Sequence, residues 1–193
     1  LYVAPTRALL NNLAPRLRRL TCMLGRRAMV WHGDVPACQR KVFINDPADV
    51  LATTPESIEA LLLSVKTPGK ALLSRIRAVV IDEVHAFATA DRGSHLVALL
   101  ERISRLSRHD VQRVGLSATV GDPHRICTWL SGSSTRPTRV IDLGHRNIEP
   151  RLALDFVGGL DMAALMVDRL YPGTRRLVFA DSRCGVEGLG GVL

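Results

Sequence analysis

Two adjacent carboxylates follow an apolar run near the middle of the 193-residue chain. The run from Ala78 to Ile81 is typical of a buried strand, and Asp82 and Glu83 come directly after it, with His85 two positions further on. One carboxylate of such a pair can hold Mg²⁺ through water, while the other orients and deprotonates an attacking water. A solvated acidic turn has the same residues, so the pair alone leaves both interpretations open.

Hydroxyl and arginine side chains follow other strand candidates. Thr6 and Arg7 stand at one expected helix start and Thr54 at another, where free backbone N–H groups and positive potential can grip phosphates. Ser117 and Thr119 end the strand that follows the acidic pair, so a hydroxyl–imidazole hydrogen bond can form there. Each of these residues is also an ordinary helix cap, but their recurrence on successive strands favours a shared function.

These residues need a sheet to bring them together. Short apolar runs alternate with helical patterns, and several runs are apolar on both faces, as in a parallel sheet covered on each side. The alternation predicts an α/β fold with a doubly wound parallel sheet, in which ligands bind beyond the carboxyl ends of the strands. The predicted strands are Leu1–Ala4, Ala28–His32, Asp49–Thr53, Ala78–Asp82, Arg113–Ser117, Arg139–Leu143, Leu152–Val157 and Leu177–Asp181.

Two helical patterns contain residues that oppose a helix. Pro15 lies inside the apolar stripe from Leu9 to Leu20, and an interior proline costs roughly 3 kcal/mol, so we predict a kink or a restart there. The last ten residues include the four glycines Gly185, Gly188, Gly190 and Gly191, so we predict that this tail is a poor helix.

The composition limits the partners without identifying them. The net charge is +8, and 23 of the 26 basic residues are arginine, which suits phosphate, although a compositional bias of the source genome explains the same count. No apolar run approaches the roughly 20 residues of a membrane helix, so no membrane partner is expected. The four cysteines, Cys22, Cys38, Cys127 and Cys184, are widely spaced, so we expect small buried hydrophobes in a reducing cytoplasm.

Taken in order, these segments resemble a superfamily 2 helicase of the DEAD/DEAH-box type. They are similar to motifs Ia, Ib, II, III and IV, at Pro5–Leu9, Thr53–Ser57, Asp82–His85, Ser117–Thr119 and Leu177–Arg183. More narrowly, the chain resembles Lhr-like (large helicase-related) proteins at Trp31–Asp34, Ala60–Leu63 and Asp82–Gly93.

The resemblance implies a truncated RecA-like fold of the P-loop NTPase type, with ATP and Mg²⁺ as cofactors. Asp82 would coordinate Mg²⁺ through water, and Glu83 would activate the hydrolytic water. His85, Ser117 and Thr119 would couple the state of the nucleotide to domain movement. A single strand of nucleic acid, with DNA favoured over RNA, would contact Thr6, Arg7, Gly33, Thr54 and Arg92 through its backbone.

The chain has no G-x-x-x-x-G-K-[ST] sequence; Pro68–Ala71 lacks both the earlier glycine and the hydroxyl residue. In the family that phosphate loop precedes motif Ia, so we expect the chain to begin inside a larger helicase and to be inactive alone. The resemblance divides the chain into a first RecA-like domain (1–143), a linker (144–160) and the start of a second RecA-like domain (161–193).

Two other functions remain open at this point. One is a non-catalytic nucleic-acid-binding module derived from a helicase. The other is a metal-dependent hydrolase that uses Asp82, Glu83 and His85 as ligands. Tight binding of zinc or manganese without nucleotide would favour the hydrolase.

Overall fold

The structure is a computed structural model that describes residues 1–88, 91–107, 109–118, 120–142, 154–170, 173, 175 and 177–192. The chain divides into two compact units, Leu1–Asp142 and Leu143–Leu193. Thr119, one of the predicted site residues, lies outside the described residues.

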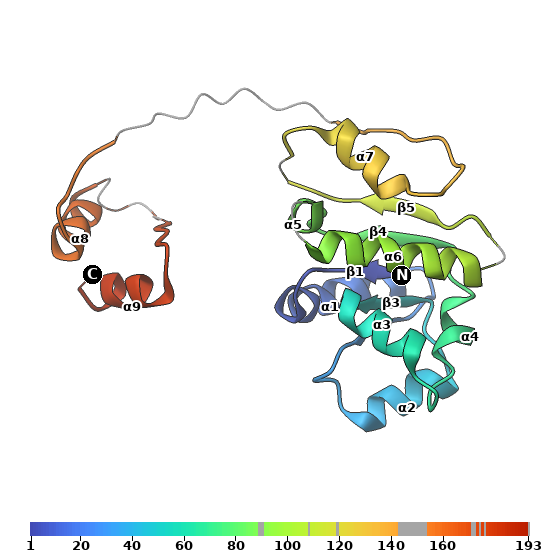
Figure 1. The fold of residues 1–193 in the computed structure, drawn as a ribbon. Coiled ribbons are helices and arrows are strands. Elements are labelled where there is room, and N and C mark those ends of the chain that lie inside the picture. The colour runs from blue at the N-terminus through green and yellow to red at the C-terminus, as the bar shows by residue number, and fades with distance from the viewer. Residues whose placement is uncertain are drawn as a thin grey trace. The chain divides into compact units, whose positions relative to one another are not determined.

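The first unit is built on a parallel sheet of five strands in the order β2-β3-β1-β4-β5 (Figure 1). This topology confirms the predicted doubly wound α/β fold, and the five strands lie within two residues of their predicted bounds. The strands are β1 (Tyr2–Val3), β2 (Ala28–Trp31), β3 (Val50–Thr53), β4 (Ala78–Ile81) and β5 (Gln112–Gly115).

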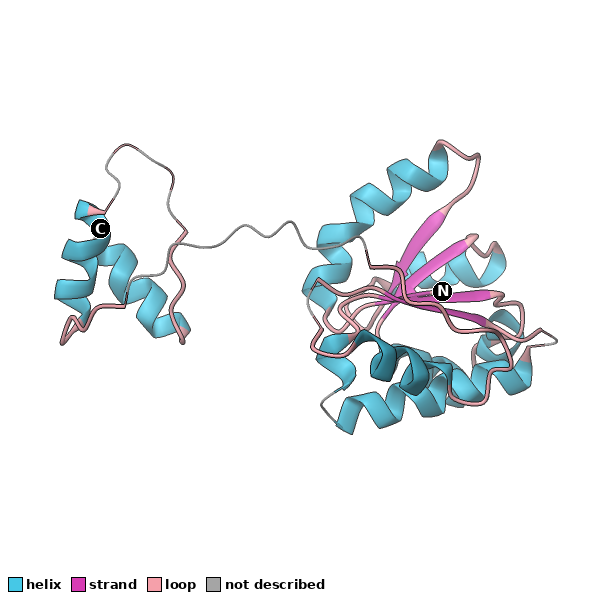
Figure 2. Ribbon diagram, turned by 90° about the horizontal axis from the view of Figure 1, so that it is seen from above, coloured by secondary structure: helices cyan, strands magenta, loops and turns pink. Residues whose placement is uncertain are grey.

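Helices cover both faces of this sheet (Figure 2). On one face, α1 (Arg7–Cys22) packs Leu10 and Ala14 against Ala4, Val30 and Ala52. The larger apolar cluster lies on the other face and includes side chains from six helices. These helices are α2 (Ala37–Asn45), α3 (Pro55–Leu63), α4 (Gly69–Leu73), α5 (His85–Ala88), α6 (Asp91–Leu106) and α7 (Pro123–Ser131).

All five strands end in the same row of the sheet. Val3 is in register with Thr53 and Ile81, Thr53 is also in register with Trp31, and Ile81 with Gly115. Each of these residues is the last one of its strand. The segments that follow the strands therefore leave the sheet along one common edge, which places most of the predicted motifs side by side.

Helix α1 runs without interruption from Arg7 through Pro15 to Cys22, so the predicted restart at Pro15 does not occur. Leu10 and Ala14 are buried against the sheet just before the proline, while Pro15 itself faces solvent. Packing of this apolar stripe offsets the loss of one backbone hydrogen bond.

The prediction that the cysteines are buried is wrong. Cys22, Cys38 and Cys184 are exposed, Cys127 is half-buried, and all four are free thiols. Cysteine is buried in most proteins, but here its position on the solvent side of a helix decides its exposure.

The second unit contains α8 (Leu160–Arg169) and α9 (Arg183–Val192). The prediction of a poor helix in the tail is wrong, because α9 forms despite its four glycines. Ala164 and Leu189 are buried, and a Cβ placed at Gly188 would lie 3.6 Å from Leu160 Cδ1, so the two helices pack closely. Tertiary packing outweighs the low helix propensity of glycine here. Throughout the described residues, the structure shows no helix with the length and apolar character needed to cross a membrane.

Three predicted strands are wrong where the structure describes them. Residues 139–142, 154–157 and 177–181 form no strand. Their apolar side chains Ile141, Leu154, Phe156, Leu177 and Phe179 are largely exposed. A strand needs a neighbouring strand to satisfy its backbone, and within the described residues none pairs with these segments.

Candidate functional site

Asp82 follows β4 and is held by groups from two directions. Its backbone N–H donates to the carbonyl oxygen of Val3 in β1 over 2.8 Å. Its carboxylate accepts a hydrogen bond from the Tyr2 hydroxyl (2.7 Å, to Oδ2) and another from the backbone N–H of Glu83 (3.0 Å, to Oδ1). Each oxygen keeps a further lone pair, so an oriented carboxylate remains able to bind water on a cation.

Tyr2 stays a donor in this arrangement. Burial raises the pKa of its phenol, and the hydrogen bond to Asp82 and the charge of that carboxylate raise the pKa further. The phenol is therefore protonated at neutral pH and fixes one oxygen of Asp82.

Glu83 has a left-handed backbone conformation, with φ at +48°, and it is the only non-glycine residue with positive φ in the described part of the chain. This region costs a residue with a Cβ about 1–2 kcal/mol. The turn is held in place because the next residue, Val84, donates its N–H to Leu116 over 2.9 Å. The Glu83 side chain is 37% exposed, so its carboxylate remains accessible.

His85 links this turn to the segment after β5. Its Nδ1 lies 2.7 Å from Ser117 Oγ and 3.4 Å from Glu83 Oε2. The hydroxyl–imidazole contact expected from the sequence is therefore present. One ring nitrogen faces both a carboxylate and a hydroxyl, so displacement of either group changes the surroundings of the other.

Thr6, Arg7 and Gly33 come together at the start of α1. Thr6 is the N-cap, and its Oγ1 accepts the N–H of Leu9 over 3.3 Å. The Arg7 guanidinium donates from Nη1 to Asp34 Oδ1 over 2.8 Å, and a Cβ at Gly33 would lie 3.5 Å from Arg7 Nη2. Thr6, Arg7 and Gly33 are exposed residues, so a strand of nucleic acid can reach them.

Arg92 connects the segment after β1 with the start of α3. Its Nη2 donates to the carbonyl oxygen of Pro5 (2.9 Å) and to Glu56 Oε1 (2.6 Å). Thr54, the N-cap residue of α3, is buried, and its Oγ1 lies 3.3 Å from Ser57 Oγ. Thr54 is therefore less accessible than the other predicted contact residues.

Glu56 carries a negative charge beside Arg92. Burial acts to raise the pKa of Glu56, but hydrogen bonds from its own backbone N–H, from Thr54 and from Arg92 outweigh burial, so the pKa lies below its ordinary value. The carboxylate is ionised at neutral pH and holds the guanidinium in place.

Sequence reasoning assigned no role to three side chains that hold the predicted residues: Tyr2 on Asp82, Asp34 on Arg7, and Glu56 on Arg92. Asp34 is next to Gly33 in the sequence and Glu56 is two positions after Thr54, so each acid stands close to a predicted contact residue, but the arginines they pair with are 27 and 36 positions away. Tyr2 offered no local signal, because it meets Asp82 only through the pairing of β1 with β4.

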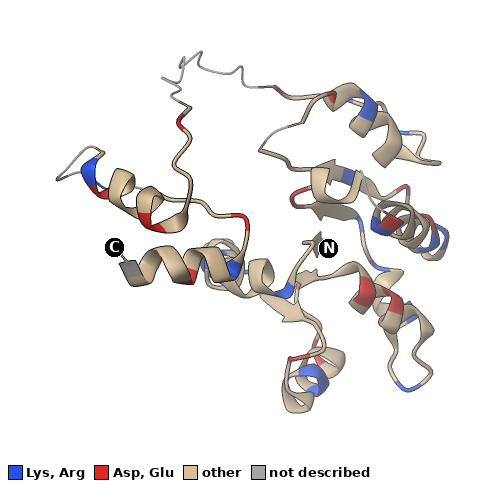
Figure 3. Cartoon of the chain, turned by 60° about the vertical axis from the view of Figure 1, so that its left-hand side comes forward, with Lys and Arg blue, Asp and Glu red and all other residues tan. Residues whose placement is uncertain are grey.

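The charge distribution alone does not locate the site. Figure 3 shows basic positions on several helices and loops of the first unit, interspersed with acidic ones. The site is defined by the common edge of the sheet, where Asp82, Glu83, His85 and Ser117 lie after β4 and β5. Arg7 follows β1 at the same edge, and Arg92 reaches it from α6 through its bonds to Pro5 and Glu56.

The residues at the acid pair fit Mg²⁺ held through water. Asp82 and Glu83 offer carboxylate oxygens, which this cation prefers. Among the described residues, no three His, Cys, Asp or Glu side chains are grouped to hold a metal ion by themselves. Water and ligand oxygens would therefore have to complete the coordination of any cation held by Asp82.

A family model described as DEAD/DEAH box helicase matches residues 1–126. A Lhr helicase/probable uracil glycosylase of Mycolicibacterium smegmatis is 39% identical, over 98% of this chain and 14% of its own length. An ATP-dependent helicase Lhr-Core of Methanothermobacter thermautotrophicus is 30% identical, over 98% of this chain and 24% of its own length. The chain thus spans about a quarter or less of these relatives.

Solved structures show the same fold. One is the structure of Mycobacterium smegmatis helicase Lhr bound to ssDNA and AMP-PNP, with a sequence identity of 36% and a TM-score of 0.59. The match covers 69% of the present chain and 19% of the helicase chain. The crystal structure of the DUF1998 helicase MrfA is 22% identical with a TM-score of 0.74, over 99% of this chain and 30% of that chain, and it supports the fold alone.

Proposed function

Because the chain belongs to the DEAD/DEAH box helicase family, we propose that it is part of an ATP-driven motor that moves along nucleic acid or unwinds it. Relatives that match nearly the whole chain include an ATP-dependent helicase. The observation that supports the proposal most is the common row of strand ends, which brings the acid pair and the arginine groups to one edge. Ligands bind at that edge in folds of this kind.

On the nucleotide side, we propose that Asp82 holds Mg²⁺ through water and that Glu83 takes the proton of the attacking water. The Tyr2 hydroxyl and the Glu83 N–H orient Asp82, so its position does not depend on the ion. When bound with ATP, Mg²⁺ would supply positive charge at the phosphates. The exposed Glu83 carboxylate is positioned by the backbone turn and by His85.

On the nucleic-acid side, we propose that the strand's phosphates contact Thr6, Arg7, Gly33, Thr54 and Arg92, with DNA favoured over RNA. Backbone N–H groups in the first turn of α1, next to the Thr6 cap, would donate to the phosphates alongside the guanidinium groups of Arg7 and Arg92. The presence of ssDNA in the structure of the M. smegmatis relative supports this assignment.

Coupling between the two sides would involve His85, Ser117 and Thr119. We assign 1–143 to a first RecA-like domain, 144–160 to a linker and 161–193 to the start of a second such domain, in a cytoplasmic protein. ATP binding between two domains of this type would close them, and hydrolysis would reopen them.

Nucleic-acid binding is tested first, by fluorescence anisotropy of the chain with a labelled oligothymidine of about 12 nucleotides over a series of salt concentrations. Arg7→Ala should weaken binding and reduce the magnitude of the slope of log K against log salt by about 0.7, the value for one lost phosphate contact on a single strand. Arg77→Ala is the matched control, because Arg77 is an exposed arginine just before β4, at the opposite end of the strands.

If Arg7→Ala and Arg77→Ala changed the affinity and its salt dependence equally, the proposed contact surface would be contradicted. Uridine oligomers of the same length test the preference for DNA over RNA.

We further propose that the chain alone binds ATP weakly and does not turn it over, because its sequence has no phosphate loop to fix the γ-phosphate near Glu83. A nucleic-acid-stimulated ATPase assay on the purified chain tests this. Robust turnover would show that the phosphate site is misplaced.

A further inference from the structure

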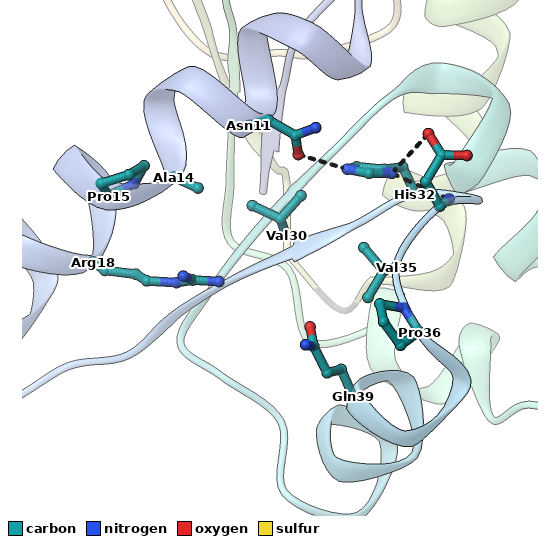
Figure 4. Close-up of a pocket in the computed structure, with 10 residues that line it drawn as sticks. Asn11, Ala14, Pro15, Arg18, Val30, His32, Val35, Pro36 and Gln39 are labelled. Carbon is teal, nitrogen blue, oxygen red and sulfur yellow. Dashed lines mark hydrogen bonds and ion pairs between the residues drawn. The ribbon is translucent and has the colours of Figure 1, made fainter.

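A hollow of about 330 Å³ lies between α1 and the segment that joins β2 to α2 (Figure 4). Its walls include the apolar side chains of Ala14, Val30 and Val35, all of which are buried. This volume is at the small end of the range for ligand sites, and apolar walls with a few polar groups are typical of such sites.

Polar side chains from two helices extend toward this hollow. Figure 4 shows Arg18 reaching in from α1 and Gln39 from α2, on either side of the space that Val30 and Val35 face. Within the described part of the chain, neither the Arg18 guanidinium nor the Gln39 amide has a hydrogen-bond or ion-pair partner. Both groups are therefore available to a ligand.

His32 determines which groups Asn11 offers. The imidazole is 4% exposed, and its Nδ1 accepts the backbone N–H of Asp34 over 3.3 Å. Its Nε2 lies 2.9 Å from Asn11 Oδ1, and because an amide oxygen only accepts, Nε2 is the donor in this contact. The Asn11 oxygen is thus in use, so the amide N–H₂ is what Asn11 has left to donate to a ligand.

The hollow adjoins the proposed path of the nucleic-acid backbone. Asp34 lines the hollow, and its Oδ1 pairs with the Arg7 guanidinium, which itself lies beside Gly33. A nucleotide whose phosphate reaches Arg7 is therefore next to the opening of this space.

The chemistry of the hollow favours a base over a phosphate. The walls formed by Val30 and Val35 suit a flat apolar face, which a phosphate does not have, and the Asp34 carboxylate, paired with Arg7, adds no positive charge to attract one. Donors on Asn11 and Arg18 suit ring carbonyl oxygens at the edge of that ring. We propose that this hollow receives one base of the single strand whose backbone contacts Arg7 and Gly33; the inference rests on the nucleic-acid contact proposed above.

The test compares two labelled strands of about 12 nucleotides, oligothymidine and an abasic strand with the same number of phosphates. The chain should bind the base-bearing strand roughly tenfold more tightly, on the scale of one well-placed base contact. Equal affinity for the two strands would overturn the inference and leave the proposed backbone contacts standing. Failure to bind either strand would overturn the proposed function itself, and the inference with it.

Two pairs of variants assign the base-dependent part of the affinity to the hollow. Gln39→Ala should reduce the affinity ratio of the two strands toward one, while Asn45→Ala, which removes an exposed amide from the same helix, should leave it unchanged.

Arg18→Ala should also reduce the ratio, whereas Arg19→Ala removes the same charge from α1 outside the hollow and should weaken both strands equally. All four side chains are exposed, so each variant should fold. A ratio that Gln39→Ala and Arg18→Ala leave at the wild-type value would overturn the inference.

Discussion

The hydroxyl of Tyr2 donates a hydrogen bond of 2.7 Å to Oδ2 of Asp82, across 80 positions of the chain. The two residues meet because β1 and β4 are neighbouring strands, with Tyr2 in register with Val80. The carboxylate that we propose as the Mg²⁺ holder is therefore oriented by a phenol from the adjacent strand.

This hydrogen bond predicts a loss of stability at alkaline pH. Burial, the hydrogen bond and the charge of Asp82 raise the pKa of Tyr2 in the folded state above the value of about 10 of an unfolded chain. A raised pKa contributes stability that is fully present below about pH 10 and is lost as the pH rises through the native pKa. Wild type should therefore lose more stability than Tyr2→Phe between about pH 9 and 11, as measured by urea unfolding.

Ultraviolet titration of the phenols gives a second measurement of the same contact. Tyr2 should ionise at a higher pH than an ordinary tyrosine, and this high-pH step should be missing from the titration of Tyr2→Phe. In Asp82→Asn, which removes the carboxylate charge, the step should move toward the pH at which an ordinary tyrosine ionises. If the free energy of unfolding falls equally with rising pH in wild type and in Tyr2→Phe, the contact does not stabilise the folded state.

The left-handed conformation of Glu83 predicts an unusual preference for glycine. At φ +48° glycine avoids the Cβ penalty, so Glu83→Gly should be more stable than Glu83→Ala by about 1 kcal/mol in urea unfolding. Glu59, inside helix α3, is the matched control, and there the order should reverse, with glycine less stable than alanine by about 1 kcal/mol. The same order at both positions would contradict the left-handed turn.

Much of the first unit was predictable, because its strands are short apolar runs followed by polar motifs. Val79 and Ile81 are buried, and the carboxylates that follow them stand where a parallel sheet must place them. The contact of His85 with Ser117 followed from the expected adjacency of their strands. In this unit the pattern of apolar and polar residues agrees with the sheet topology, so the sequence predicts both the strands and the residues that follow them.

The errors arise where tertiary contacts decide the outcome. The segments around Ile141 and Phe179 have strand-like residues, but a strand forms only when a partner is available, and sequence pattern does not report the partner. The glycines of the tail predict a poor helix, whereas α9 forms with Leu189 buried and Gly188 close to Leu160 of α8. Tyr2 was missed because its role depends on a neighbour 80 positions away.

The pair of Glu56 and Arg92 predicts a small, acid-sensitive contribution to stability. Hydrogen bonds overcome burial and lower the pKa of Glu56, so its contribution is present above the ordinary pKa of about 4.5 and is lost as the pH falls through the native pKa. Glu56→Gln should cost less than about 1 kcal/mol at neutral pH, because both side chains are partly exposed.

The stability difference between wild type and Glu56→Gln should narrow as the pH falls below about 4.5 and should close only below the native pKa of Glu56. In the Arg92→Gln background, Glu56→Gln should have a smaller effect at neutral pH, since the partner is gone. A full-sized effect in that background would mean that Glu56 acts through other groups.

The close packing around Gly93 predicts that adding a side chain at this position of α6 lowers the stability of the protein. A Cβ at this third position of α6 would overlap the carbonyl oxygen of Phe87 and would lie 3.0 Å from Trp129 Cζ2, so α5 and α6 must separate to admit it. Gly93→Ala should therefore cost about 2 kcal/mol of stability, as overpacking does elsewhere. Gly121→Ala is the control, because no heavy atom lies within 4 Å of a Cβ there, and it should change stability by less than about 0.5 kcal/mol.

The same substitution tests whether Arg92 needs its present position. The Arg92 guanidinium lies 5.6 Å from the Phe87 ring centroid and bonds to Pro5, so displacement of α6 moves it away from the segment after β1. Gly93→Ala should therefore weaken single-strand binding under conditions where the variant remains folded, and Gly121→Ala should not. Wild-type affinity in a folded Gly93→Ala variant would remove Arg92 from the contact surface, because a displaced guanidinium cannot keep the same phosphate contact.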